Sequence, residues 1–219
     1  MIYILLGHAA LELIPKKLWN HPQIKAYCKK RKKRPSECLL DYTYHWKAMM
    51  ELKNREQRGR PDIVHICLLN ALDSILNKER KLKVFIYTQQ GFLIEIKPET
   101  RVPRNYDRFK GLIEDLFKKK YVPNKDNWLL KLEKVELKDF VQKFDYIILL
   151  DEEGERREVK EIIKGNTLYI IGAFPHGKFP KEYYDLANEV ISIYPKSLSA
   201  WVVLNEIIIE AERKFGILQ

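Results

Sequence analysis

The sequence predicts a layered α/β fold in which helices cover a sheet. Short apolar runs rich in Ile, Val and Tyr alternate with longer stretches of helical periodicity. Four of the apolar runs are apolar on both faces, as buried parallel strands are. With 219 residues and 46% hydrophobic side chains, the chain can bury one good-sized core without disulfides or metals. We therefore expect a single domain over residues 1–219.

Six strands are expected, each bounded by Gly, Pro or charged residues. They are Tyr3–Leu6, Val84–Tyr87, Leu93–Ile96, Tyr146–Leu150, Leu168–Ile171 and Val190–Ile193. Helical periodicity predicts four helices between and after them, over Asp41–Leu52, Asp62–Leu76, Asp107–Lys119 and Leu198–Phe215. Two close strands flank Gln89-Gln90-Gly91, which predicts a small β-hairpin appendage inserted near residues 81–103.

The last expected helix is apolar over much more than one face. Its apolar residues are Leu198, Trp201, Val202, Val203, Leu204, Ile207, Ile208 and Ile209. We expect one side to face the core and the other a second subunit. The alternative is a helix buried wholly inside one domain.

Composition excludes several classes of protein. The three cysteines have no CxxC spacing, and none of the five histidines has metal-ligand spacing to another His or Cys, so we expect no disulfide framework and no metal. The apolar N-terminal run is too short for a signal segment, and charged residues interrupt every candidate membrane helix. We expect a soluble, cytoplasmic protein.

A formal net charge of +10 favours a polyanionic partner where the excess is clustered. One block is Lys29–Arg34, and arginines gather at residues 55–60 and 101–108. Arginine suits bidentate phosphate contact better than lysine does. For the block at 29–34 an ordinary charged surface is an equal alternative.

Two loops follow expected strands near the C-terminus, where ligands bind in open α/β sheets. They are Ile171–Lys178, with Gly172, His176 and Gly177, and Ile191–Ser199, with Pro195. Together they could form a pocket with apolar walls for an adenine and a methionine tail. By spacing alone a plain structural turn is the favoured interpretation of each loop, and neither contains a dinucleotide or P-loop motif. His176 could act as a base, although a structural role is more common for a loop histidine.

Two arginine segments suggest an RNA-binding surface. In Arg60-Pro61-Asp62, Asp62 could hold the Arg60 guanidinium for phosphate or base contact, or could simply complement a helix start. A role of Asp62 as general base ranks below the orienting role. Farther along, Arg101, Arg104 and Arg108 interleave with aromatic residues, as in RNA-binding strips.

The order of these segments resembles a known family, the ribosome-biogenesis pseudouridine methyltransferases of the SPOUT class, called the essential-for-mitotic-growth family in eukaryotes. The similar segments are Ala10–Pro15, Arg60–Ile63, Leu72–Lys78, Thr100–Arg104, Gly172–Lys178 and Ile191–Ser199. The chain looks like an archaeal-type member. It departs from the family at Ile75, where proline is usual, which leaves a helix kink in doubt.

The resemblance implies a SPOUT-type sheet with a C-terminal trefoil knot, a homodimer, and S-adenosylmethionine as methyl donor, with S-adenosylhomocysteine as product. It implies methylation of N1 of a pseudouridine in small-subunit rRNA, with small-subunit assembly proteins as further candidate partners. The implied catalytic residues are Asp62 and Arg60, and the implied RNA contacts are Arg60, Arg101, Arg104 and Arg108. The implied cofactor contacts are Gly172, Gly177, Val190, Ile191, Ser192, Ile193, Tyr194, Pro195, Leu198, Ser199 and Ala200.

Two other functions remain open. One is a non-catalytic rRNA-binding assembly factor, against which the two glycine-containing loops argue. The other is a SPOUT enzyme that acts on tRNA or another nucleotide. The absence of a defensible nucleophile triad fits methyl transfer from a sulfonium, which needs alignment rather than covalent catalysis.

Overall fold

The computed structural model describes residues 1–218 and contains one eight-stranded sheet, in the order β4-β5-β3-β2-β1-β7-β6-β8. The strands are β1 (Ile2–Ala9), β2 (Leu82–Thr88), β3 (Phe92–Ile96), β4 (Tyr121–Val122), β5 (Leu130–Lys134), β6 (Tyr146–Arg156), β7 (Thr167–Gly172) and β8 (Glu189–Ser192). The five strands from β2 to β8 in this order are parallel, whereas β3, β5 and β4 add an antiparallel edge.

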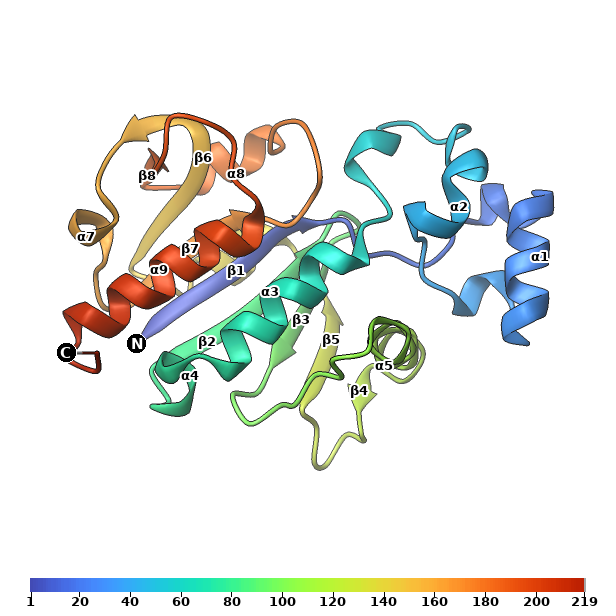
Figure 1. Ribbon diagram of the computed structural model, residues 1–219, viewed down its shortest axis with the longest axis horizontal. Coiled ribbons are helices and arrows are strands. Elements are labelled where there is room, and N and C mark those ends of the chain that lie inside the picture. The colour runs from blue at the N-terminus through green and yellow to red at the C-terminus, as the bar shows by residue number, and fades with distance from the viewer. Residues whose placement is uncertain (219) are drawn as a thin grey trace.

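Helices cover both faces of the sheet, as the sequence predicts (Figure 1). They are α1 (Pro22–Arg31), α2 (Tyr42–Met49), α3 (Pro61–Asp73), α4 (Ile75–Lys78), α5 (Tyr106–Lys119), α6 (Leu137–Val141), α7 (Val159–Ile162), α8 (Lys181–Leu186) and α9 (Ala200–Lys214). Three 3₁₀ turns lie at Lys16–Leu18, Pro35–Glu37 and Arg55–Gln57.

Side chains on the two faces of the sheet pack into two separate cores, because successive side chains of a strand point to opposite faces. In β1, Ile4 and Leu6 join the core beneath α3, α5 and α9, while Leu5 joins the core beneath α6 and α8. The central strands are almost fully buried, which confirms the parallel strands that the apolar runs predict.

The predicted hairpin exists, but the prediction that it forms an appendage is wrong. β2 pairs in parallel with β1, and β3 turns back after Gly91 to pair with β2 and then β5. Both strands therefore belong to the main sheet. The part that projects is a lobe formed by residues 14–52, with α1 and α2, which has its own small core around Leu18, Ile24 and Met49 (Figure 1).

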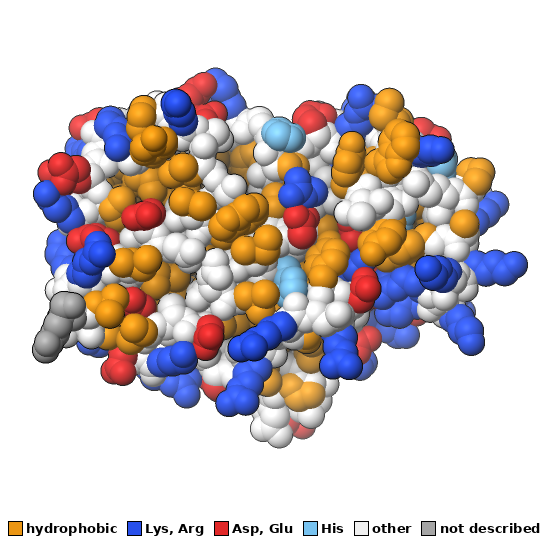
Figure 2. Space-filling model, in the orientation of Figure 1, with side chains coloured by type: hydrophobic (Ala, Val, Ile, Leu, Met, Phe, Trp, Pro, Cys, Tyr) orange, Lys and Arg blue, Asp and Glu red, His pale blue; other side chains and the backbone are white. Residues whose placement is uncertain are grey.

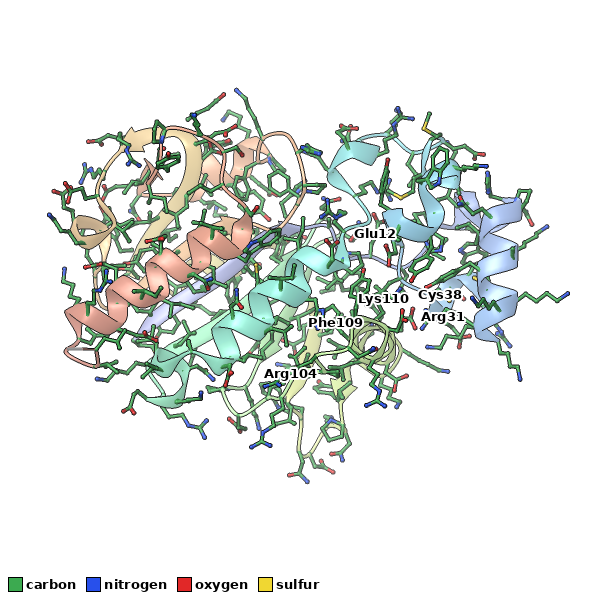
Figure 3. All side chains as sticks on the ribbon, in the orientation of Figure 1. Glu12, Arg31, Cys38, Arg104, Phe109 and Lys110 are labelled. Atoms are coloured by element: carbon green, nitrogen blue, oxygen red, sulfur yellow. The ribbon has the colours of Figure 1, made fainter. Side chains whose placement is uncertain are left out.

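Buried charge pairs attach this lobe to α5. Glu114 of α5 is buried and binds Arg31, Lys33 (2.7 Å) and the backbone N–H of Leu39 (3.0 Å). Lys110, which is labelled in Figure 3, is also buried and binds Asp41 at 3.0 Å. Within the block Lys29–Arg34, Arg31 and Lys33 thus have a structural role.

The long helix predicted over Asp62–Leu76 is interrupted. Ser74 is extended (ψ 154°) and ends α3, and its hydroxyl caps α4 by accepting from Asn77 N–H at 3.2 Å. The helix break that Ile75 left in doubt is therefore present.

β6 and β8 pair in an unusual register. Leu150 of β6 pairs with Ile191 of β8, and Glu155, five residues later, pairs with Ile191 as well. Gly154 lies so close to the backbone of Val190 and Ile191 that a Cβ there would be 2.6 Å from Ile191 N. The connecting residues 151–154 therefore arch tightly over β8.

Candidate active site

A cavity opens at the carboxyl ends of the parallel strands. Its volume is about 560 Å³, within the range of small-molecule sites. The segments that follow β7 and β8 form most of its wall, and the arch after Leu150 of β6, the start of α3 and the first turn of α9 complete it. These strands run in one direction, so their carboxyl ends meet at one edge of the sheet.

The two loops singled out from the sequence come together in this cavity. Nine of the eleven expected cofactor contacts line it, namely Gly172, Gly177, Ile191, Ser192, Ile193, Tyr194, Leu198, Ser199 and Ala200. The other two lie outside its wall. Val190 packs into the core beneath α6 and α8, because neighbouring residues of a strand face opposite sides of the sheet. Pro195 is exposed.

Glycine is needed at both glycine positions of the first loop. A Cβ on Gly172 would be 2.9 Å from the Phe174 ring and 3.2 Å from the Phe179 ring. Gly177 has a φ of +90°, and a Cβ there would be 2.7 Å from Nε2 of Gln57. The Phe174 ring thus packs directly against the backbone of Gly172, and the Gln57 side chain against the backbone of Gly177.

Arg60 reaches the cavity because its backbone is fixed at the end of β1, where its N–H donates to Ala10 O at 3.1 Å. The guanidinium of Arg60 forms two parallel hydrogen bonds to the Asp62 carboxylate, of 2.8 and 2.7 Å. This pairing raises the pKa of Arg60, so its positive charge persists throughout the physiological range. Asp62 itself does not line the cavity.

Arg101, Arg104 and Arg108 are exposed and do not line the cavity. Their segment runs beside α3, where His65 Nε2 lies 2.7 Å from Pro103 O. Figure 3 shows Arg104 by the loop that leads into α5. The role of this strip in RNA binding stays a prediction.

Sequence reasoning missed one part of the cavity. Three acidic residues, Asp151, Glu152 and Glu153, line it from the arch after Leu150, and Trp201 lines it from the first turn of α9. Asp151 accepts a hydrogen bond from Tyr184 at 2.9 Å, and Glu153 binds Lys178 at 2.7 Å. The carboxyl-end rule applied to Tyr146–Leu150, as well as to the last two strands, would have found these acids.

His176 lines the cavity and is exposed. Among residues 1–218 no group of three or more His, Cys, Asp or Glu side chains is arranged to hold a metal ion. Over the same residues, no helix is long and apolar enough to cross a membrane.

The fold and the site together define a class: an α/β protein with a crevice of cofactor size at the carboxyl ends of its parallel strands. The model of the EMG1/NEP1 methyltransferase family matches residues 4–212. The chain therefore belongs to the EMG1/NEP1 methyltransferase family, and the family resemblance seen in the sequence is confirmed.

Relatives from archaea match over nearly their whole length. The ribosomal RNA small subunit methyltransferase Nep1 of Thermococcus sibiricus is 46% identical, over 97% of this chain and 98% of its own. The protein of the same name from Staphylothermus marinus is 44% identical, over 99% and 97%. The crystal structure of Archaeoglobus fulgidus Nep1 bound to S-adenosylhomocysteine matches with a TM-score of 0.90 and 40% identity, and covers 97% of this chain and 98% of that one.

Proposed function

We propose that this protein transfers a methyl group from S-adenosylmethionine to N1 of a pseudouridine in small-subunit ribosomal RNA. One observation carries the proposal: the two C-terminal loops and Arg60, which is distant from them in the sequence, line one cavity at the carboxyl edge of the sheet. The relatives at 44–46% identity are named as small-subunit rRNA methyltransferases, and the matching crystal structure contains the demethylated cofactor. Acting on ribosomal RNA, the protein is proposed to work in the cytoplasm.

The residues of the cavity suit the proposed cofactor. Ile171, Ile191 and Leu198 give apolar surface for a purine and a methionine chain. Asp151, Glu152 and Glu153 give the wall negative charge, which complements a sulfonium and an ammonium group. When bound, S-adenosylmethionine supplies an activated methyl group, so the protein has to bind and align rather than provide a nucleophile.

Arg60 is the proposed link between cofactor and RNA, with Asp62 as the residue that positions it. Held by two hydrogen bonds, the guanidinium enters the cavity in a defined orientation with donors left over for a phosphate or a base edge. The exposed Arg101, Arg104 and Arg108 are proposed to hold the RNA backbone farther out.

We propose a homodimer that forms through α9 and α4. Ile209 of α9 is 37% exposed and Ile75 of α4 is 40% exposed, and α4 packs against α9. Exposed aliphatic side chains on adjacent helices are typical of a subunit interface. The sequence analysis predicted the same interface, because the last helix has apolar residues on more than one face.

We further propose that residues 1–219 form one knotted domain. A strand residue has two edges, and each edge can pair with one neighbour. Because Ile191 pairs with both Leu150 and Glu155, the two parts of β6 are proposed to flank β8, so that β8 passes under the arch 151–154. Such threading is rare and gives the chain a trefoil knot.

Calorimetric titration of S-adenosylmethionine and S-adenosylhomocysteine tests the cofactor. The expected result is one cofactor bound per subunit. Transfer of radiolabelled methyl to synthetic rRNA loops that contain uridine or pseudouridine then tests the substrate. Methyl on the pseudouridine loop alone is expected. A folded protein that binds neither cofactor would be an assembly factor, and methylation of uridine would point to a different SPOUT activity.

A further inference from the structure

Exposed apolar side chains concentrate on one short helix outside the cavity. Among residues 1–218, eight large hydrophobic side chains are exposed, and four of them lie in or next to α2: Tyr42, Tyr44, Trp46 and Met50. Tyr42, Trp46 and Met50 are four residues apart and therefore share one side of the helix. We call these three residues the α2 strip. Figure 2 shows hydrophobic side chains gathered on this lobe.

The α2 strip lies outside the lobe's core. The buried side of α2 is formed by His45, Ala48 and Met49, which face the lobe's own core. The strip's side chains are 54%, 46% and 58% exposed, in sequence order. Large apolar groups left in water on one edge of a helix indicate a binding surface.

The α2 strip borders the segment that carries Arg60 to the cavity. Tyr42 N–H donates to Gly59 O at 2.8 Å, and Gly59 packs so closely against Met49 that a Cβ there would be 2.8 Å from its methyl group. In the same segment, Gln57 donates to Lys178 O of the cavity loop at 3.1 Å. The segment 57–60 therefore contacts both the cavity loop and α2.

The chemistry of the strip suits nucleic acid. No acidic side chain lies between Tyr42 and Met50. Lys47 lies over the Trp46 ring at 5.4 Å, and the guanidinium of Arg55 contacts the Met50 sulfur. Aromatic faces interleaved with cations are the arrangement that stacks unpaired bases and neutralises their phosphates. The exposed patch on α4 and α9 differs, since it is aliphatic.

We propose that the α2 strip is a stacking platform for an unpaired base of the RNA, next to the nucleotide that enters the cavity. The inference rests on the proposed function and deepens it by assigning a contact to an RNA base outside the cavity. Flipping one nucleotide out of a loop leaves its neighbours unstacked, and an aromatic side chain replaces the lost stacking. Trp46, with the largest ring of the strip, carries most of the effect.

The test measures binding of a synthetic rRNA loop, with 2-aminopurine beside the target nucleotide, to the wild-type protein and three variants. Trp46→Ala removes the ring, Trp46→Phe keeps an aromatic face, and Thr43→Ala truncates an exposed neighbour on the same helix. We expect Trp46→Ala to raise the RNA Kd about tenfold or more and to relieve quenching of 2-aminopurine. Trp46→Phe should retain most of the affinity, and Thr43→Ala all of it.

Two further readouts distinguish stacking from other causes. The salt dependence of binding should keep its slope in Trp46→Ala, because stacking releases no counterions, and S-adenosylmethionine affinity should be unchanged. Unchanged RNA affinity in Trp46→Ala would overturn the proposal. A change of oligomeric state in Trp46→Ala would also overturn the proposal, since the strip would then be a protein interface. If RNA binding depends on Trp46 but the protein transfers no methyl group, the proposed function is wrong and the stacking platform is still supported.

Discussion

Gly172 and Arg60 show how single residues shape the site. Gly172 ends β7 and leaves room for the ring of Phe174, while Arg60 immediately precedes α3 and is held by Asp62. The sequence predicted both because each follows a recognisable signal, a strand end or an Arg-Pro-Asp helix start. It gave no sign that Trp201 faces the cavity, because its apolar helix predicts burial on every side.

Replacing Gly172 should damage cofactor binding directly. In Gly172→Val the new side chain displaces the Phe174 ring, whose Cε1 lies 2.9 Å from the added Cβ, into the cavity. We expect the Kd for S-adenosylmethionine to rise by about a hundredfold or more in calorimetry, or about 3 kcal/mol. Gly165→Ala is the matched control, since nothing lies within 4 Å of a Cβ there. Equal loss in both variants would point to general destabilisation instead.

Asp62→Asn should affect RNA and leave the cofactor alone. The amide is uncharged and cannot accept both guanidinium hydrogen bonds, so Arg60 loses its fixed orientation. We expect kcat/KM for the RNA loop to fall by about tenfold to a hundredfold, with unchanged cofactor affinity. Stability should change by less than about 1 kcal/mol, because both side chains are one-third exposed. A wild-type rate would remove Asp62 from the mechanism.

Among the secondary-structure elements, the long apolar ones were predictable and the short ones were not. All six expected strands are present and α2, α5 and α9 end within about three residues of their predicted limits. The sequence analysis missed β4, β5, α1 and the short helices α6, α7 and α8. β5 has only two leucines, which alternate with charged residues, and it packs against α5. α1 has little apolar periodicity, and ion pairs such as Arg31–Glu114 attach its lobe to α5. Contacts between distant segments decide such elements.

His45 on α2 should make the protein sensitive to acid. Burial lowers its pKa from 6.5 to about 4, and its Nδ1 already accepts from Asp41 N–H at 3.0 Å, so protonation would break that bond. Between these two pH values His45 is protonated in the unfolded chain but neutral in the folded protein. The stabilisation present above pH 6.5 is therefore lost as pH falls toward 4, by about 3 kcal/mol at most.

Chemical unfolding at a series of pH values measures this effect. The free energy of unfolding should decline less steeply below pH 6.5 in His45→Gln than in the wild-type protein. Parallel declines in the two proteins would assign the acid sensitivity to other groups, such as His8, whose pKa burial also lowers.

On the scale of the whole molecule, the two exposed apolar patches should have different partners. Ile209→Glu places a charge in the proposed subunit interface and should halve the mass seen by analytical ultracentrifugation. Met50→Glu places the same charge in the more exposed α2 strip and should leave the dimer intact. A monomeric wild-type protein, or dissociation by Met50→Glu, would contradict this division of the surface.

The double pairing of Ile191 sets an order of events for the folding chain. In the proposed knot, β8 and α9 must pass beneath the arch 151–154 before residues 191–203 can complete the cavity wall. During refolding from denaturant, the far-UV circular dichroism signal should therefore recover earlier than the ability to bind S-adenosylhomocysteine. Intrinsic fluorescence measures that binding in the same samples. Simultaneous recovery would mean that no threading step is required. If threading is required, a chain still emerging from the ribosome cannot hold its cofactor until residues 191–203 have been made and passed beneath the arch.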